Sequence, residues 1–496
     1  MYSTRLGLLS VLWLCIMTCA FPRATASQAT QTRTPDTLAG RQLAALLQAL
    51  NTPDAKTIRA FVEKHIAKSF LDAIPLDEHV AVNSKFAEEN GGLALERIEH
   101  VDTYEVAALT RAKSNNTLIR IHMKVEKEPP HGISALYYEI DPDITATPES
   151  PGKGKMTEAD ILRSLETYLN ERAAADRFSG AVLVAKGGKP IFARAYGLAS
   201  KAFNVPNRVD TKFNLGSMNK MFTAIAVAQL AEKGKLSFDD TVGKHLPAYP
   251  NKEVSNKVTI HHLLTHTSGM GDYFNEEYEK SAKERLRAVK DYFPLFVNEP
   301  LKFEPGQKWD YSNAGFMLLG AIIEKVSGQS YFDYVRENLY KPAGMTNTDC
   351  YEMDQDTPNL AIGYTRERAS RPWKNNLYLH VVKGGPAGGG FSTVADLLKF
   401  DIALRNHKLL SRKYTDLVLT GKVAQPGSPI SKYAYGFGDE RRNGHRIVGH
   451  GGVFPGINSQ LEIYLDLGYT VAVMSNYDPP AASRVADRLR DMLTQE

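Results

Sequence analysis

The segment FNLGSMNKMFTAIAVAQL, residues 213–230, constrains the fold of this 496-residue chain more than any other part of it. Apolar residues occur on nearly every face of a helix drawn over this segment, which is typical of a helix buried all round in a large domain. The segment nevertheless contains Lys220. Burying an ammonium group is costly unless the group is paired or loses its proton, so we expect a specific partner for Lys220.

Ser217 is the candidate partner. It lies three residues before Lys220, and residues three apart share one face of a helix, so the lysine amine can reach the serine hydroxyl. A desolvated lysine loses its proton more readily, and a neutral amine beside a hydroxyl can act as a general base. At a helix start, the helix dipole also stabilises negative charge that develops near the serine. The pattern predicts a serine nucleophile activated by a lysine.

The first 26 residues have the layout of a secretory signal peptide. Arg5 precedes a largely apolar stretch, residues 6–21, and residues 24–26 (Ala-Thr-Ala) form a small-residue cleavage site. The apolar stretch is short for a transmembrane helix, and polar residues follow it at once. We therefore expect cleavage near Ala26, no stable membrane span in the mature chain, and a secreted or periplasmic location.

Composition excludes several classes of function. The net charge is +4 and arises from well-mixed charges without long runs of either sign, so neither nucleic-acid binding nor a polybasic membrane patch is expected. Cys15 and Cys19 lie within the expected signal peptide, which leaves Cys350 alone in the mature chain. No disulfide framework is therefore expected, and a single cysteine without further context is not a candidate nucleophile.

Residues 27–144 are expected to form a small α+β domain. Two apolar stripes predict two helices, the second of which begins at Thr52 and Pro53. The stripes consist of Leu43, Leu46, Leu47 and Leu50, and of Ile58, Phe61, Val62 and Ile66. After a turn at residues 114–116, alternating apolar residues at 119–125 predict a strand, and antiparallel strands after helices resemble the NTF2-like domains. We find no catalytic constellation in this domain and expect it to mediate protein contacts.

A linker is expected at residues 145–155, where the sequence TATPESPGKGK is rich in Pro, Gly and small polar residues. The second domain, residues 156–496, starts with an amphipathic helix and a hairpin that turns at Gly187 and Gly188. The segment QLEIYLDLGYTVAVMSN predicts another hairpin near the C-terminus, before a helix at 481–493. Strands at both ends of the domain predict one sheet built from both termini, with helices over its faces.

Five motifs occur in the second domain, in the order FNLGSMNK, HLLTHTSGM, PGQKWDYSNAGFMLLG, GPAGGGFSTVADLLKF and GHGGVFPG. Together they resemble the serine β-lactamase and penicillin-binding superfamily, in particular the class C β-lactamases and their D,D-carboxypeptidase, D-aminopeptidase and esterase relatives. The resemblance covers residues 156–496. It implies an α+β class C β-lactamase-like fold, in which an antiparallel sheet flanked by helices is joined to an all-helical subdomain. It also implies that no cofactor is needed.

The resemblance implies roles for further residues. The middle motif of the class C branch, Y-x-N, is matched by the tripeptide that starts at Tyr311. Tyr311 would carry the proton between Ser217 and the leaving group, and the Asn313 amide would bind Lys220 or the substrate amide. The backbone N–H groups of Ser217 and Val453 would form the oxyanion hole. Whether Lys220 or Tyr311 is the base stays open at this point.

The third motif departs from the family pattern. The usual Lys-Thr-Gly is replaced by His450, Gly451 and Gly452, which with Asn313 are the expected substrate-binding residues. Lysine supplies a fixed cation for a substrate carboxylate, whereas histidine is cationic only part of the time near neutral pH. Histidine at this place is familiar in the peptidase and esterase relatives. The departure therefore argues against efficient β-lactam hydrolysis.

Two other kinds of site are set aside. His262 and His266 are spaced as in a zinc-binding helix, but Leu263 takes the place of the glutamate of that motif, so no metal is expected. No G-x-S-x-G sequence occurs, which argues against the nucleophile elbow of an α/β-hydrolase.

The sequence thus predicts a secreted hydrolase that forms an acyl-serine intermediate on amide or ester bonds, of the D,D-peptidase or esterase type. The expected substrates are peptidoglycan-derived D-amino-acid peptides or small esters. A class C-like β-lactamase, or a penicillin-binding protein that is acylated without turnover, is the alternative. The aromatic and charged stretch at residues 272–300 is expected to border the pocket and to influence specificity.

Overall fold

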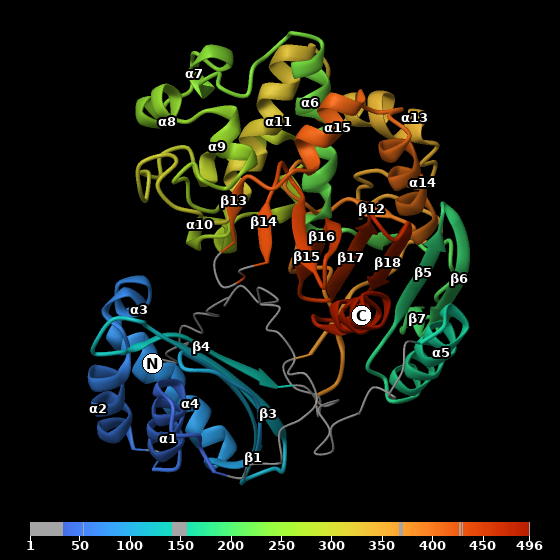
Figure 1. The fold of residues 1–496 in the computed structure, drawn as a ribbon. Coiled ribbons are helices and arrows are strands. Elements are labelled where there is room, and N and C mark those ends of the chain that lie inside the picture. Colours follow the sequence, from blue (N-terminus) through green and yellow to red (C-terminus); the bar gives the residue numbers. More distant parts are fainter. Residues whose placement is uncertain are drawn as a thin grey trace, which may run out of the picture. The chain divides into compact units, whose positions relative to one another are not determined.

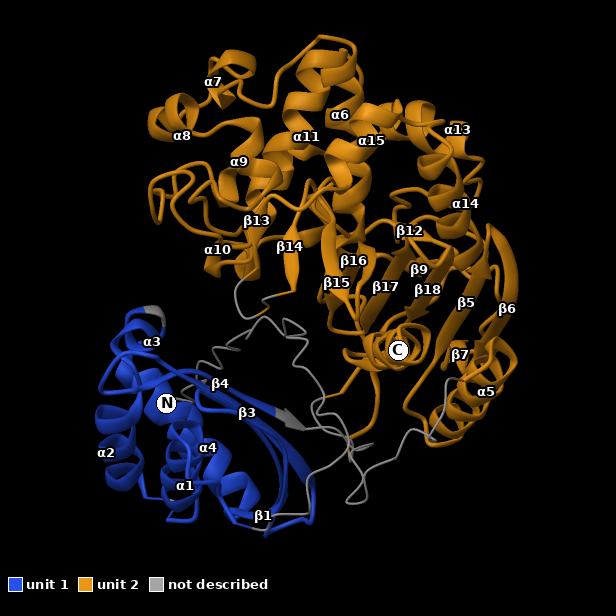
Figure 2. Ribbon diagram, viewed as in Figure 1, with its two compact units in different colours: residues 1–154 blue, residues 155–496 orange. Residues whose placement is uncertain are grey.

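The computed structural model describes residues 33–52, 54–140, 156–366, 371–425, 428 and 430–495. The expected signal peptide and linker lie outside these residues. Contacts divide the chain into two compact units, residues 1–154 and 155–496 (Figure 2). Among the helices of the described ranges, none combines the length and apolar character needed to cross a membrane.

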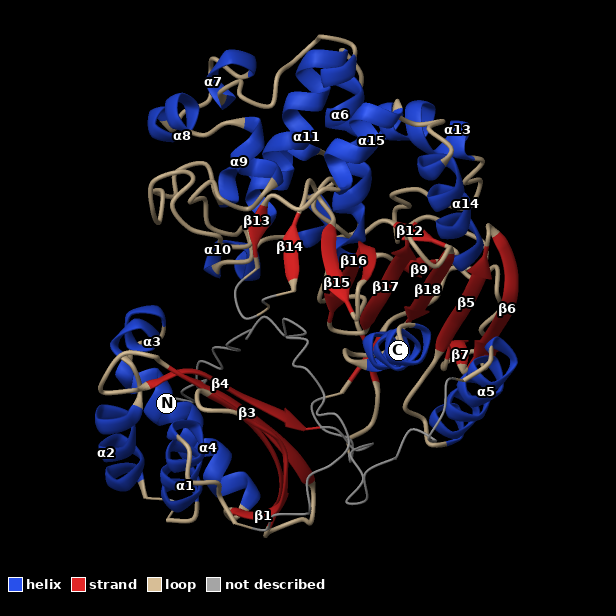
Figure 3. Cartoon of the chain, in the orientation of Figure 1, coloured by secondary structure: helices blue, strands red, loops and turns tan. Residues whose placement is uncertain are grey.

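Unit 1 consists of four helices followed by a four-stranded antiparallel meander in the order β1-β2-β3-β4 (Figure 3). The helices are α1 (Leu38–Leu50), α2 (Ala55–His65), α3 (Lys68–Ala73) and α4 (Leu76–Asn90). The strands are β1 (Leu93–Val101), β2 (Glu105–Ala112), β3 (Leu118–Val125) and β4 (Ile133–Ile140). The expected α+β arrangement is present, and the resemblance to NTF2-like domains stays a prediction.

The helices of unit 1 differ from the sequence expectation in two ways. Helix α2 begins at Ala55 rather than at Thr52, because the Asp54 carboxylate caps it by accepting the Thr57 N–H at 2.8 Å. The prediction of only two helices is wrong, since α3 and α4 follow them. Helix α4 buries the polar His79 and Asn83 beside its apolar residues, so its apolar stripe is too weak to be found by periodicity.

Unit 2 is built on an eight-stranded antiparallel sheet in the order β13-β14-β15-β16-β17-β18-β5-β6 (Figure 1). Its strands are β5 (Gly180–Lys186), β6 (Lys189–Tyr196), β13 (Val423–Ala424), β14 (Ser431–Tyr433), β15 (Gly438–Arg442), β16 (His445–Phe454), β17 (Ile457–Tyr464) and β18 (Tyr469–Ser475). Strand β18 pairs with β5, and Val471 lies opposite Val184. The expected sheet built from both termini is therefore confirmed.

Both faces of this sheet are covered. On β5, Leu183 joins the large apolar core that contains the central helices, whereas Val182 and Val184 join a second core. The second core lies under α5 (Glu158–Ala174) and α16 (Ala481–Leu493), which Figure 1 shows over the sheet. A strand buried on both faces has no polar alternation, which explains the continuous apolar sequence of β5.

The remaining elements are short strands and helices, most of them in the helical part of unit 2. They include α7 (Val242–His245), α8 (Lys252–Lys257), α9 (Ile260–Leu264), α10 (Glu276–Lys280), α11 (Asn313–Ser327), α12 (Tyr331–Val335), α13 (Lys341–Ala343), α14 (Val394–Arg405), α15 (Arg412–Leu419), and the strands β7 (Leu198–Ser200), β8 (Val205–Pro206), β9 (Phe213–Asn214), β10 (Tyr364–Thr365), β11 (Lys374–Asn375) and β12 (Phe391–Ser392).

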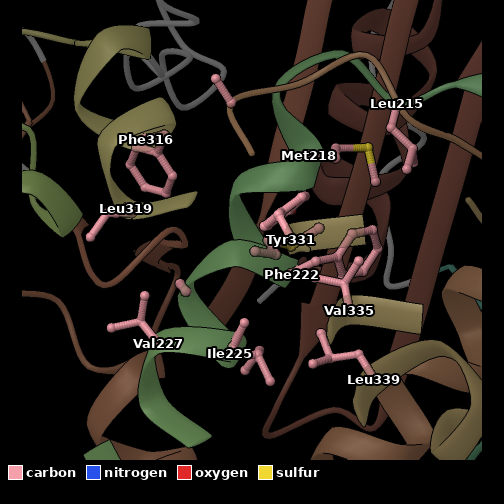
Figure 4. Packing of buried hydrophobic residues seen from close by; sticks show 14 of the residues in the cluster. Leu215, Met218, Phe222, Ile225, Val227, Phe316, Leu319, Tyr331, Val335 and Leu339 are labelled. Atoms are coloured by element: carbon pink, nitrogen blue, oxygen red, sulfur yellow. The ribbon is translucent and has the colours of Figure 1, made fainter. Parts of the chain in front are cut away.

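Helix α6 (Asn219–Glu232) runs through the centre of this helical part and is buried from Asn219 to Ala231, as its sequence predicts. The Phe222 ring makes edge contacts with the rings of Tyr340 and Phe400, with centroids 5.3 and 5.0 Å away. Figure 4 shows Phe222 of α6 among other buried residues, including Tyr331, Val335 and Leu339. One 3₁₀ turn, Gly216–Met218, leads into the helix. Ser217 therefore lies just before α6, and this buried helix holds it in place.

Candidate active site

Glycine at two positions lets strand β16 approach the turn that carries Ser217. Gly216 has φ +51°, and a Cβ added to it would lie 2.9 Å from the Gly452 Cα and 3.0 Å from the Val453 nitrogen. A Cβ added to Gly452 would collide with the Leu215 carbonyl oxygen. The backbone nitrogens of Ser217 and Val453, the expected oxyanion donors, therefore lie in the same small region.

Lys220 is fully buried, and its amine lies among oxygen atoms. The Nζ atom lies 3.3 Å from the Ser217 Oγ, 2.6 Å from the Asn313 Oδ1 and 2.5 Å from the Ala387 carbonyl oxygen. The ring of Tyr311 lies beneath the amine, with its centroid 4.7 Å away. The structure thus brings together Ser217, Lys220, Asn313 and Tyr311.

The two carbonyl oxygens around Lys220 define how its amine can act. Oδ1 of Asn313 and the Ala387 oxygen accept hydrogen bonds and cannot donate. The amine therefore donates to both carbonyl oxygens, and it also lies within hydrogen-bonding distance of the Ser217 Oγ, at 3.3 Å. This geometry is suited to a lysine that takes the serine proton.

The orientation of the Asn313 amide is set by Asp272. Asn313 Nδ2 donates to the Asp272 Oδ2 at 2.7 Å, which leaves Oδ1 of the same amide to face Lys220. The Phe274 N–H donates to the other carboxylate oxygen at 3.2 Å. Burial raises the pKa of Asp272, while the Asn313 amide, the Phe274 N–H and the charge on Lys220 oppose this shift. Ser217, Lys220, Asn313 and Asp272 thus form one hydrogen-bonded chain.

Tyr311 lies within a group of aromatic rings. The His266 ring lies against the Tyr311 ring, with centroids 4.2 Å apart and planes tilted by 33°, and the Trp309 ring lies 6.2 Å from Tyr311. His266 Nδ1 accepts the Ser312 N–H at 3.1 Å, which fixes the loop that carries Tyr311. Burial holds the pKa of His266 well below its ordinary value, and Lys220 and His450 reinforce the shift. His266 is therefore a neutral support for Tyr311.

His450 is also neutral at physiological pH. Its pKa is lowered to about 4, first by burial and then by the nearby charge of Lys220. The Nδ1 atom lies 2.5 Å from the Gly451 oxygen, which only accepts, so Nδ1 carries the hydrogen. The Tyr433 hydroxyl then donates to Nε2 at 3.0 Å. Burial and the nearby Lys220 therefore favour the neutral form of His450, whereas residue type alone suggested a partly cationic histidine.

The glycine-rich segment at residues 384–390 fastens the nucleophile turn from the side opposite β16. The Gly389 N–H donates to the Gly216 oxygen at 3.1 Å, and the Leu215 N–H donates to the Gly390 oxygen at 2.7 Å. The same segment supplies the Ala387 oxygen to Lys220. This segment therefore helps to position both Lys220 and Ser217.

Several residues of this site were not predicted from the sequence. Asp272, His266 and Tyr433 were not identified as site residues, although Asp272 begins the stretch expected to border the pocket. Gly451, expected to bind substrate, faces the Gln460 side-chain amide on the Cβ side. On that side, Gly451 can contact a substrate only through its backbone atoms.

Comparison with known proteins agrees with the fold and the site. The β-lactamase family model matches residues 165–496. The chain is 32% identical over 329 residues to penicillin-binding protein 4* of Bacillus subtilis, which covers 63% of this chain and 71% of that protein. A penicillin-binding protein structure from Bacillus halodurans is 38% identical, with a TM-score of 0.60, and covers 66% of this chain and 98% of that one.

A D-stereospecific amidohydrolase structure from Streptomyces sp. is 26% identical, with a TM-score of 0.56, and covers 68% of this chain and 98% of that chain. The fold of unit 2 therefore resembles both a structure named as a penicillin-binding protein and one named as an amidohydrolase. The family match spans more than half of the chain and includes Ser217, Lys220 and Tyr311. The chain therefore belongs to the β-lactamase family and is a serine hydrolase of the β-lactamase and penicillin-binding type.

Proposed function

We propose that this protein is a secreted hydrolase that forms an acyl-Ser217 intermediate on amide or ester bonds, of the D,D-peptidase or esterase type. One observation carries the proposal: the fully buried Lys220 amine lies 3.3 Å from the Ser217 oxygen and donates to two carbonyl oxygens. A buried lysine in such surroundings serves proton transfer better than it serves stability.

In the proposed reaction, the Ser217 Oγ attacks the substrate carbonyl carbon and its proton moves to the Lys220 Nζ. The N–H groups of Ser217 and Val453 stabilise the oxyanion. When the tetrahedral intermediate collapses, the bond to the leaving group breaks, and the proton passes from Lys220 through Tyr311 to the leaving nitrogen or oxygen. Water then attacks the acyl carbon and gives one proton to the same groups. The bond between this carbon and the Ser217 Oγ breaks, the proton returns to Oγ, and a carboxylic acid is released.

The neutral state of His450 supports amides and esters as substrates over compounds that need a cation for their carboxylate. Its pKa of about 4 leaves no charge at this position near neutral pH. The similarity to a D-stereospecific amidohydrolase points to D-amino-acid amides and peptides. A penicillin-binding or β-lactamase activity is the second candidate, which the similarity to penicillin-binding protein 4* favours.

Hydrolysis of a chromogenic acetate ester tests the proposed nucleophile and base. Ser217→Ala should abolish turnover, and Lys220→Ala should reduce kcat by about a thousandfold or more, since both act in the same step. Lys186→Ala is the matched control, because this lysine pairs with Glu158 at the surface, outside the site. Near-normal turnover by Lys220→Ala would refute the assigned base.

Intact-mass spectrometry with a penicillin separates the two candidates. A long-lived penicilloyl adduct that is absent in Ser217→Ala would identify a penicillin-binding protein, and a short-lived adduct would identify a β-lactamase. If esters are hydrolysed and no adduct forms, the esterase or amidase type is supported. Secretion is tested separately by N-terminal sequencing of the mature protein, for which we expect a start near Ser27.

A further inference from the structure

Apolar side chains open to solvent gather beside the end of strand β16. We define the apolar rim as Phe274, Leu377, Tyr378, Leu379, Val453 and Phe454. Tyr378 is 91% exposed, and every other member except Phe454 is between 40% and 42% exposed. Single exposed apolar side chains are common, but a contiguous group of them marks a binding surface.

The three segments that carry the apolar rim are held together. The rings of Phe274 and Phe454 lie 5.7 Å apart between centroids, and the His380 ring lies 6.2 Å from Phe454. The Asn376 side chain donates to the Pro455 carbonyl at 2.8 Å. These contacts hold the three segments that carry the rim residues next to one another.

The apolar rim is continuous with the active site on two sides. The nitrogen of Val453 is an expected oxyanion donor and lies beside the Gly216 turn. Phe274 donates its N–H to Asp272, which holds the amide that binds Lys220. A substrate held by the oxyanion donors therefore meets the apolar rim directly.

The positions of the proton-transfer groups indicate which end of the substrate meets the rim. His450 lies three residues before Val453 on β16. The ring of its partner Tyr433 contacts the His266 ring, which in turn contacts the Tyr311 ring. A strand advances about 3.3 Å per residue, so His450 and Val453 are separated by about 10 Å along β16. Because Tyr311 serves the leaving group, the leaving group lies toward His450. The acyl part then extends toward the rim.

We propose that the apolar rim binds an apolar acyl group, the part of the substrate that becomes attached to Ser217. This inference rests on the proposed function and adds the class of acid that the enzyme accepts: medium-length aliphatic or aromatic acyl groups. None of the six side chains carries a charge, so recognition comes from removing apolar surface from water. Each methylene that becomes fully buried in the transition state then raises kcat/KM by about fourfold.

The test compares p-nitrophenyl acetate with p-nitrophenyl hexanoate, which share one leaving group. For the wild type we expect kcat/KM to be at least about tenfold higher on the hexanoate. Phe454→Ala should lower kcat/KM on the hexanoate by about tenfold and leave the acetate within about twofold. Tyr378→Ala should act in the same direction, and its 91% exposure makes misfolding no explanation.

Phe203→Ala is the control, since this ring is 80% exposed and lies between β7 and β8, outside the rim. A second series of esters keeps the acetyl group and varies the leaving phenol. The order of the kcat/KM values within this series should be the same in the wild type and in every rim variant. The proposal is overturned if the wild type shows no preference for hexanoate, if both esters respond equally to Phe454→Ala, or if only the phenol series responds. Turnover that survives Ser217→Ala would instead overturn the proposed function, so the two failures are distinguishable.

Discussion

Replacing Asp272 tests whether the chain from Ser217 to this carboxylate acts as a unit. In Asp272→Ala, the buried Asn313 N–H loses its acceptor, which costs about 1–3 kcal/mol and frees the amide to turn its oxygen away from Lys220. Asp272 and the Lys220 amine are separated by two hydrogen bonds and the Asn313 amide, a distance on the order of 7 Å. At this distance, opposite charges attract each other by about 2 kcal/mol if the effective dielectric constant is about 20. In the proposed reaction, the carboxylate would therefore stabilise the proton that Lys220 receives during acylation.

We expect Asp272→Ala to lower kcat/KM on the acetate ester by about a hundredfold, because both the orientation and the charge are lost. Asp272→Asn keeps an oxygen that can accept the Asn313 N–H and loses only the charge, so about tenfold is expected. The matched control is Asp310→Asn, which removes a carboxylate next to Tyr311 that pairs with Lys302. If Asp272→Ala stayed within twofold of the wild type, the assigned role of this carboxylate would be wrong.

The same prediction has a pH dependence. Burial raises the pKa of Asp272, so its charge is lost on acidification at a higher pH than for an ordinary aspartate. The wild-type kcat/KM should therefore fall in mildly acidic buffer, and the Asp272→Asn enzyme, which has no charge there to lose, should fall less. Parallel pH profiles for the two enzymes would contradict this reasoning.

Three further predictions concern packing and protonation. His450 has a pKa of about 4 in the folded protein, so between pH 6.5 and 4 the unfolded chain binds a proton that the folded chain does not, and the free energy of unfolding falls. The difference between the urea midpoints at pH 7.5 and pH 5 should therefore be smaller in His450→Gln than in the wild type. Gly452→Ala would push β16 away from Leu215 and should lower kcat by about a hundredfold, as loss of an oxyanion donor does, with near-native circular dichroism. Phe222→Ala should destabilise unit 2 by about 3–5 kcal/mol in urea unfolding, and a cost below about 1 kcal/mol would refute the packing argument.

Local patterns in the sequence predicted much of unit 2. The spacing of Ser217 and Lys220 placed two reacting groups on one turn, and the structure places them 3.3 Å apart. Gly187 and Gly188 predicted a hairpin, and both have positive φ between β5 and β6. In each case the information lies within a few neighbouring residues.

Contacts between distant segments were not predictable in this way. Asp272 lies in a loop, and nothing near it in the sequence identifies Asn313, 41 residues later, as its partner. The Ala387 oxygen that binds Lys220 belongs to the backbone and has no sequence signal of its own. The neutral state of His450 depends on burial and on Lys220, so residue type alone led to the wrong charge.

Because β18 pairs with β5, the sheet that supports the active site is complete only when the C-terminal strands have been made. The nucleophile and its lysine belong to the middle of the sequence, whereas Val453 and the strands that support it belong to the end. The Ser459 hydroxyl, which donates to the Leu215 oxygen, bridges 244 residues. During synthesis, the proposed oxyanion donor Val453 is therefore the last of the named active-site residues to be made. A chain that ends before residue 453 would lack this backbone N–H and with it the proposed stabilisation of the transition state.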